Sequence, residues 1–87
     1  MAADRNAILA TVCRRLGEIL EIDASTISEN QTFADDLGAD SIALIELVDD
    51  LEQEFSSSIP DFAFDDDDLV NLRTVADAVD YIVRAHG

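Results

Sequence analysis

Residue types that commonly carry catalysis are scarce in this chain of 87 residues. The only histidine is His86, next to the last residue, where a firmly held catalytic base is not expected. The only cysteine is Cys13, which lies beside an apolar helical stripe and lacks the cationic setting that activates a thiol. Carboxylates are abundant, but a catalytic pair needs a cleft that a small helical chain does not easily supply. We therefore predict a protein that is not an enzyme, with no catalytic residues and no dedicated metal site.

Ser41 is the exception, because its position suggests an exposed hydroxyl at the start of a helix. It follows a segment in which Gly38 permits a tight turn. Two large apolar residues, Ile42 and Ile45, follow it without an obvious role in the core. Taken alone, a serine here is explained as an ordinary N-cap, a role that Asp40 can also fill. The local pattern leaves open whether the hydroxyl does anything more.

Three segments show the apolar periodicity of amphipathic helices. The expected helices run from Asp4 to about Leu20, from about Ser41 to Phe55, and from Thr74 to about Ala85. Thr74 and Asp77 resemble a capping box at the start of the last helix, with Asp in place of Glu. A short helix is expected at about 66–71, because the four carboxylates at 65–68 suit a helix N-terminus. No segment alternates for long enough to predict a strand. The prediction is a single small all-α bundle over residues 1–87.

The segment between the first two helices, residues 21–40, is rich in turn-forming residues and reads as a loop. A structureless loop of this length is unusual inside a compact domain. Four apolar residues are expected to pin it to the core: Ile22, Ile27, Phe33 and Leu37.

The distribution of charge excludes several kinds of partner. The chain carries 20 acidic residues against five arginines, and its formal net charge is −15. No basic residue lies between Arg15 and Arg73, a span that holds 17 of the acids. Such a surface repels phosphate backbones and anionic lipids, and no apolar run is long enough to cross a membrane. We predict no nucleic acid and no membrane as partners. The lone cysteine and the lack of a signal-peptide pattern favour the cytoplasm.

An ordered series of motifs resembles the acyl carrier protein family. The motifs are the segment Phe33–Ile42, then Glu46-Leu47, Leu51–Phe55, Ile59–Asp61, Thr74-Val75 and Asp80–Ile82. The family signature is Asp-Ser-Leu after a Leu-Gly turn, and this chain has Ile42 in the third place. The resemblance covers nearly the whole chain. It implies a non-catalytic carrier of acyl intermediates, in fatty-acid, polyketide or related specialised biosynthesis.

The same resemblance assigns roles to individual residues. It implies that Ser41 is the attachment site for 4′-phosphopantetheine, which a phosphopantetheinyl transferase moves from coenzyme A and whose thiol holds acyl groups as thioesters. Asp40 is implied in docking the transferase. A phosphodiester at a helix N-terminus is also electrostatically favourable.

Docking of other enzymes is implied for the second helix. Synthases, acyltransferases and other pathway enzymes are expected to present basic patches to a mixed apolar and acidic face. Its residues are Ile42, Ile45, Glu46, Asp49, Asp50 and Glu52. Arg15 and Arg73 are expected to lie in or next to the flanking helices, outside the surface formed by the loop around Ser41, the second helix and the acidic connection. The protein is expected to be a monomer.

Two features leave the pathway open. Ile42 also suits peptidyl or aminoacyl carriers of nonribosomal systems, which form the first alternative. The connection from Pro60 to Thr74 is longer than in a typical fatty-acid carrier. It contains Phe62 and Phe64, which either extend the core and anchor a longer loop or line an acyl cavity. The alternative from another class is an acidic helical adaptor or divalent-ion-binding module without a covalent cofactor.

Overall fold

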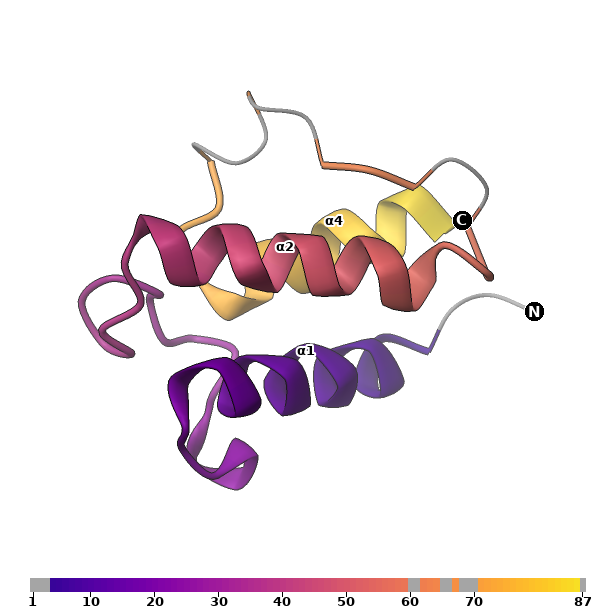
Figure 1. The fold of residues 1–87 in the computed structure, drawn as a ribbon. Helices are drawn as coiled ribbons and strands as arrows, with labels where there is room; N and C mark the ends of the chain where they lie inside the picture. The colour runs from indigo at the N-terminus through magenta and orange to yellow at the C-terminus, as the bar shows by residue number, and fades with distance from the viewer. Residues whose placement is uncertain (1–3, 60–61, 65–66, 68–70, 87) are drawn as a thin grey trace.

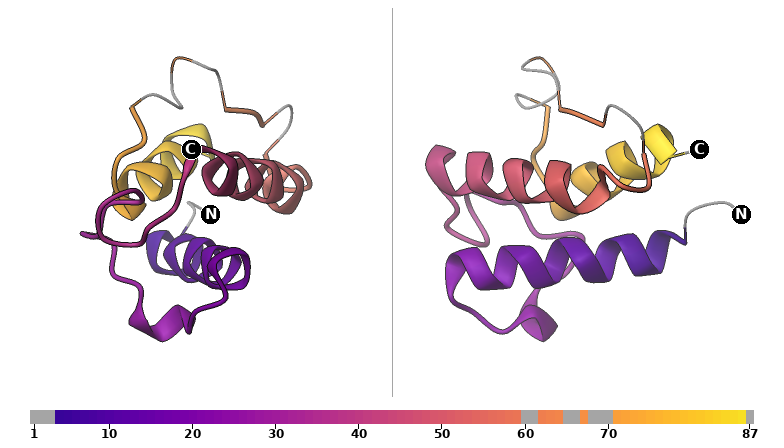
Figure 2. Two further views of the ribbon diagram at one scale, coloured as in Figure 1. Left: turned by 60° about the vertical axis from the view of Figure 1, so that its left-hand side comes forward. Right: turned by 45° about the vertical axis from the view of Figure 1, so that its right-hand side comes forward.

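The computed structural model describes residues 4–59, 62–64, 67 and 71–86. Its elements are α1 (Arg5–Leu20), the short 3₁₀ helix η1 (Ala24–Thr26), α2 (Ser41–Phe55) and α4 (Val75–His86) (Figure 1). α2 and α4 run in the same direction and α1 runs opposite to both, as the other views also show (Figure 2). The all-α fold with three longer helices is confirmed. The short helix predicted at about 66–71 lies mostly outside the described residues and stays a prediction.

Extended pairing is minimal in the part of the chain that the structure describes. It consists of one isolated antiparallel bridge between Thr32 and Thr74. None of the helices in this part is long and apolar enough to cross a membrane.

The first two long helices begin where an aspartate caps them. The Asp4 carboxylate accepts a hydrogen bond from the Asn6 backbone N–H at 3.0 Å. The Asp40 carboxylate accepts one from the Ala43 backbone N–H at 2.9 Å. Of the two N-cap candidates for α2, the structure therefore selects Asp40 and not Ser41.

α4 begins with the reciprocal capping box that the sequence predicted. The Asp77 backbone N–H donates to the Thr74 hydroxyl at 3.2 Å. In return, the Asp77 carboxylate accepts bonds from the backbone N–H groups of Thr74 and Arg73, both at 3.0 Å. The bond from the Thr74 backbone is the main reason that the pKa of the Asp77 carboxyl lies below its ordinary value.

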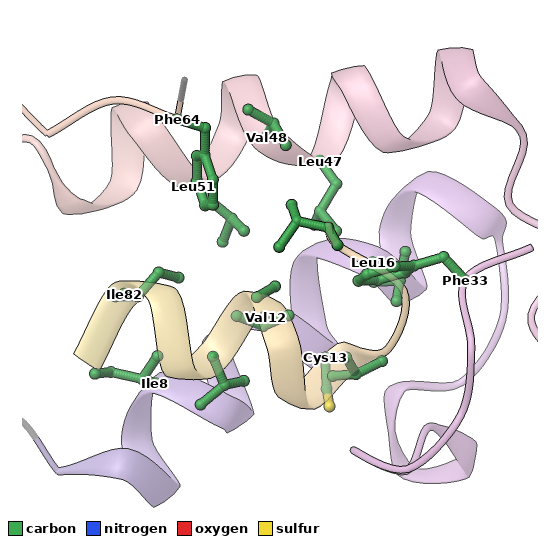
Figure 3. Close-up of a cluster of buried hydrophobic side chains, with 14 of the residues drawn as sticks. Ile8, Val12, Cys13, Leu16, Phe33, Leu47, Val48, Leu51, Phe64 and Ile82 are labelled. Atoms are coloured by element: carbon green, nitrogen blue, oxygen red, sulfur yellow. The ribbon is translucent and has the colours of Figure 1, made fainter. Parts of the chain in front are cut away.

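One apolar core fills the space between the three helices (Figure 3). Its most deeply buried large side chains come from all three of the predicted stripes. They are Val12 and Leu16 of α1, Leu47 and Leu51 of α2, and Val75, Val79 and Ile82 of α4. Burying a side chain of this size stabilises the fold by about 1.5–3 kcal/mol relative to leaving it exposed.

The loop over residues 21–40 is pinned to the core, although not by all four predicted residues. Ile27 and Phe33 are buried, and Leu37 packs against the core while partly exposed. The prediction for Ile22 is wrong, because its side chain is 42% exposed. Ala39, which the sequence did not single out, is buried instead.

Ile22 is exposed because of the way α1 ends. Glu21 adopts a left-handed conformation with φ 59°, and the following Ile22 N–H bonds back to the Gly17 carbonyl at 3.0 Å. This closing turn lies at the surface, so Ile22 does not reach the core.

Backbone hydrogen bonds tie the same loop to the start of α4. The pairs are Phe33 N–H to the Arg73 carbonyl at 2.9 Å, Val75 N–H to the Gln31 carbonyl at 3.1 Å, and Ala76 N–H to the Glu29 carbonyl at 2.9 Å. The segment just before α4 therefore lies beside the segment that leads to α2.

The segment 62–64 is part of the folded structure. Phe62 and Phe64 are both buried, with ring centroids 5.3 Å apart, and the Phe64 ring stacks on Tyr81 at 4.5 Å. The Phe64 backbone N–H donates to the Glu52 carboxylate at 2.8 Å, and the Tyr81 hydroxyl donates to the Ala63 carbonyl at 2.9 Å. The two phenylalanines therefore extend the core and anchor the long connection.

Candidate functional site

Ser41 is the first residue of α2 and is exposed. It lies at the end of the bundle where α1 ends and α4 begins (Figure 1). The preceding turn contains Gly38 with φ 67°, a conformation that glycine adopts readily and other residues rarely. A Cβ added to Gly38 would meet no neighbouring atom within 4 Å, so backbone conformation and not crowding favours glycine.

The Ser41 hydroxyl makes no hydrogen bond within the described ranges of the chain. The N-cap role is filled by Asp40, whose Oδ1 atom accepts the bond from Ala43. Ser41 is therefore not needed to begin α2, and its hydroxyl is available to a reacting group from outside.

A hollow of about 620 Å³ opens beside Ser41. Its apolar lining comes from the loop, from α2 and from the segment before α4: Phe33, Ala34, Ala39, Leu44 and Leu72. Exposed charged residues also line it: Asp35, Asp40 and Arg73. The hollow next to the serine is thus lined by both apolar and charged residues.

The position of Arg73 corrects one prediction. The sequence placed it outside the surface around Ser41, but it lines the same hollow as Ser41 and Asp40. The reason is the backbone bond between Phe33 and Arg73, which brings the start of α4 next to the loop. A contact across 40 residues leaves no local signal in the sequence.

The exposed face of α2 continues from Ser41. Ile42 is 68% exposed and Ile45 is 60% exposed, the highest values among the large apolar residues of the described part. Glu46 and Asp49 are exposed as well. Their spacing of three, four and seven residues from Ile42 puts all four on one side of the helix.

Asp50 and Glu52 flank this face and differ from it. Both are partly buried. The Glu52 carboxylate already accepts a hydrogen bond from the Phe64 backbone N–H. The structure therefore brings four of the six predicted docking residues onto one open face beside Ser41, and gives Glu52 a structural contact in addition.

Cys13 lies beside the apolar stripe of α1, as expected, and is a buried core residue. Its Sγ lies 4.0 Å from the Ile27 carbonyl oxygen. Burial, together with the nearby charge of Glu29, raises the pKa of the Cys13 thiol. Both effects oppose formation of the thiolate, so the side chain is poorly suited to act as a nucleophile.

The chain matches the family model for the phosphopantetheine attachment site over residues 10–82. Similar proteins include the acyl carrier protein of Acidothermus cellulolyticus, 38% identical over 98% of this chain and 95% of that protein. The acyl carrier protein of Thermotoga maritima is 40% identical over 98% of this chain and 99% of its own. The meromycolate extension acyl carrier protein of Mycolicibacterium aurum is 35% identical over 97% and 81% of the two chains.

The fold leads to the same family. A solved structure of the acyl carrier protein from Enterococcus faecalis superposes with a TM-score of 0.73. It is 34% identical to this chain, and the match covers 98% of this chain and 99% of the other. The chain belongs to the acyl carrier protein family, whose members are non-catalytic carriers that bear phosphopantetheine.

Proposed function

We propose that Ser41 carries the 4′-phosphopantetheine group and that this protein holds acyl intermediates on it as thioesters. The observation that carries the proposal is an exposed serine hydroxyl at the start of α2, with no partner among the described residues and with the N-cap role already filled. Ser41 also lies inside the region that matches the attachment-site family.

The residues around Ser41 fit the group. A phosphodiester on the Ser41 oxygen would lie at the positive end of the α2 dipole, where anions are stabilised. The adjacent hollow is lined in part by apolar residues and has room for part of a flexible arm. When bound, the group supplies the terminal thiol on which a thioester forms.

Asp40 is the proposed contact for the transferase. Its Oδ1 atom caps α2, and among the described residues no hydrogen bond is made by Oδ2. That second oxygen is free to meet a metal ion or a basic side chain on the enzyme. Ser41 needs no base of its own under this proposal, because the transferase provides the catalytic groups.

The face formed by Ile42, Ile45, Glu46 and Asp49 is the proposed docking surface for pathway enzymes. Exposed isoleucines provide apolar contact, and the carboxylates attract basic patches. Charge complementarity of this kind speeds encounter more than it strengthens binding, so a carrier is released after each visit. Asp50 and Glu52 would contribute at the edges of this contact.

The pathway is proposed to use acyl and not aminoacyl cargo. The relatives described above are named acyl carrier proteins, which supports fatty-acid, polyketide or related biosynthesis over a nonribosomal peptide system. We further propose that residues 1–87 form one carrier domain that works as a monomer in the cytoplasm.

Intact-mass measurement tests the attachment site. The apo protein is incubated with coenzyme A and a broad-specificity phosphopantetheinyl transferase, and we expect a mass gain of one phosphopantetheine. Ser41→Ala should show no gain. Ser58→Ala, which alters another exposed serine close to a helix end, should gain the same mass as the parent. Equal labelling of Ser41→Ala would place the group on another residue and refute the proposed site. No labelling of the parent would favour the helical-adaptor alternative.

A further inference from the structure

We propose that Arg73 binds an anionic oxygen group carried on Ser41, in the first place the phosphodiester of the arm. Arg73 would thereby hold the base of the arm over the hollow between the loop and the start of α4. The inference rests on the proposed attachment at Ser41 and adds a positioning residue to it.

The backbone of Arg73 is fixed beside the site. Its carbonyl accepts the Phe33 N–H at 2.9 Å, and its N–H donates to the Asp77 carboxylate at 3.0 Å. From this anchored position its exposed side chain lines the same hollow as Ser41. A long side chain on a fixed backbone is suited to follow a group attached nearby.

The guanidinium of Arg73 is also available. Three other arginines are engaged in ion pairs: Arg5 pairs with Glu29 and Asp80, and Arg14 and Arg15 pair with Glu54. Within the described residues, Arg73 and Arg84 make no ion pair. The charge of Arg73 helps to lower the pKa of the Asp77 carboxyl, but it is the smallest of the causes that act on that pKa.

The charges around the hollow favour Arg73 as the residue that binds an anion there. Asp35 and Asp40 line the hollow with Ser41, and Arg73 is the one cation among the lining residues of the described chain. A phosphodiester on Ser41 would add a further negative charge to two carboxylates, and repulsion would push the arm outward. An arginine offers a planar pair of donors that matches phosphate or carboxylate oxygens.

The anionic oxygens that Arg73 binds could also come from the cargo. A cargo with a terminal carboxylate, as in the thioester of a short dicarboxylic acid, can bring that carboxylate to Arg73 if the arm folds back. Both sources present anionic oxygens to one guanidinium, so the experiment compares them.

The test follows the Arg73 Nε–Hε signal in ¹H–¹⁵N spectra of the full chain. Four forms are prepared: apo, holo, acetyl-loaded and loaded with a dicarboxylic half-thioester, each verified by intact mass. The ³¹P shift of the phosphodiester is recorded against NaCl concentration for the parent, Arg73→Gln and Arg73→Lys. Arg84→Gln is the matched control, because it removes the other arginine without an ion pair in the described part, which lines a separate hollow on α4.

We expect the Arg73 signal to shift on conversion from apo to holo and to stay the same in both loaded forms. Arg73→Gln should change the ³¹P shift and abolish its salt dependence, Arg73→Lys should retain part of that dependence, and Arg84→Gln should match the parent. A shift that occurs only with the dicarboxylic cargo would identify the cargo carboxylate as the bound anion.

Two results would overturn the proposal. One is an unmoved Arg73 signal in every form whose mass shows the arm. The other is an equal ³¹P effect of Arg84→Gln and Arg73→Gln, which would be an effect of net charge alone. Failure of the attachment itself is seen separately, as the absence of any mass gain.

Discussion

Replacing Phe64 with alanine tests whether the connection between α2 and α4 belongs to the cooperative core. The ring is 8% exposed, stacks on Tyr81 at 4.5 Å and lies 5.3 Å from the Phe62 ring. Buried Phe→Ala changes cost about 3–5 kcal/mol, and the edge position of this ring favours a value of about 3 kcal/mol. At about 0.05–0.15 kcal/mol per residue, a chain of this length has about 4–13 kcal/mol of stability in total. The variant should therefore lose a large part of its stability and melt about 12–24 °C lower.

Urea unfolding followed by circular dichroism measures this cost. Ile45→Ala is the matched control, because it also removes an apolar side chain, but one that is 60% exposed. The control should change the free energy of unfolding by no more than about 0.5 kcal/mol. If Phe64→Ala cost no more than Ile45→Ala, the contacts of segment 62–64 would not contribute to the folded state and the reasoning would be wrong.

Two further substitutions test local features. Asp77→Ala removes half of the capping box and should cost about 1 kcal/mol at neutral pH. Because the pKa of Asp77 is lowered in the folded state, its contribution is present above the ordinary value of 3.8 and is lost as the pH falls below it. Urea unfolding should therefore show the two proteins converging in acid, and an undiminished gap there would contradict the assignment. Gly17→Ala should destabilise by about 1–3 kcal/mol although alanine favours helices, because the new Cβ would meet the Ile22 carbonyl oxygen at 2.9 Å. A rise in melting temperature would refute that steric argument.

The helices were predictable because their signals are local. The starts of α1 and α2 differ from the predicted positions by at most one residue, since the caps Asp4 and Asp40 are adjacent to the stripes they introduce. The capping box of Thr74 and Asp77 is likewise contained within four residues. Periodicity and capping act over a single turn, and a single sequence displays both.

Of the errors and open choices, one depends on a local backbone turn and the others depend on contacts that are distant along the chain. The exposure of Ile22 depends on the left-handed turn at Glu21, and a glutamate at this position does not predict such a turn. The role of Phe64 depends on Glu52 and on Tyr81, which its periodicity does not reveal. Contacts between residues this far apart depend on tertiary packing. The sequence therefore could not decide whether the phenylalanines extend the core or line an acyl cavity.

The candidate site divides in the same way. Ser41, Asp40 and the open face of α2 follow from one contiguous motif and its helix. The hollow and the position of Arg73 beside it do not follow from that motif, because they depend on the backbone contact between Phe33 and Arg73. The one sequence signal for a role of Arg73 was the composition, because Arg73 is one of only five basic arginines in an acidic chain.

The backbone ties between the loop and the start of α4 also bear on how cargo travels. Moving this loop away from α4 would require breaking the bonds that join Phe33 to Arg73, Gln31 to Val75 and Glu29 to Ala76, so large motion of the loop is energetically costly. The loop that leads to Ser41 is thereby held in place relative to the start of α4. If the arm is attached at Ser41 as proposed, its attachment point stays fixed, and the length of the arm sets how far a cargo reaches into an enzyme.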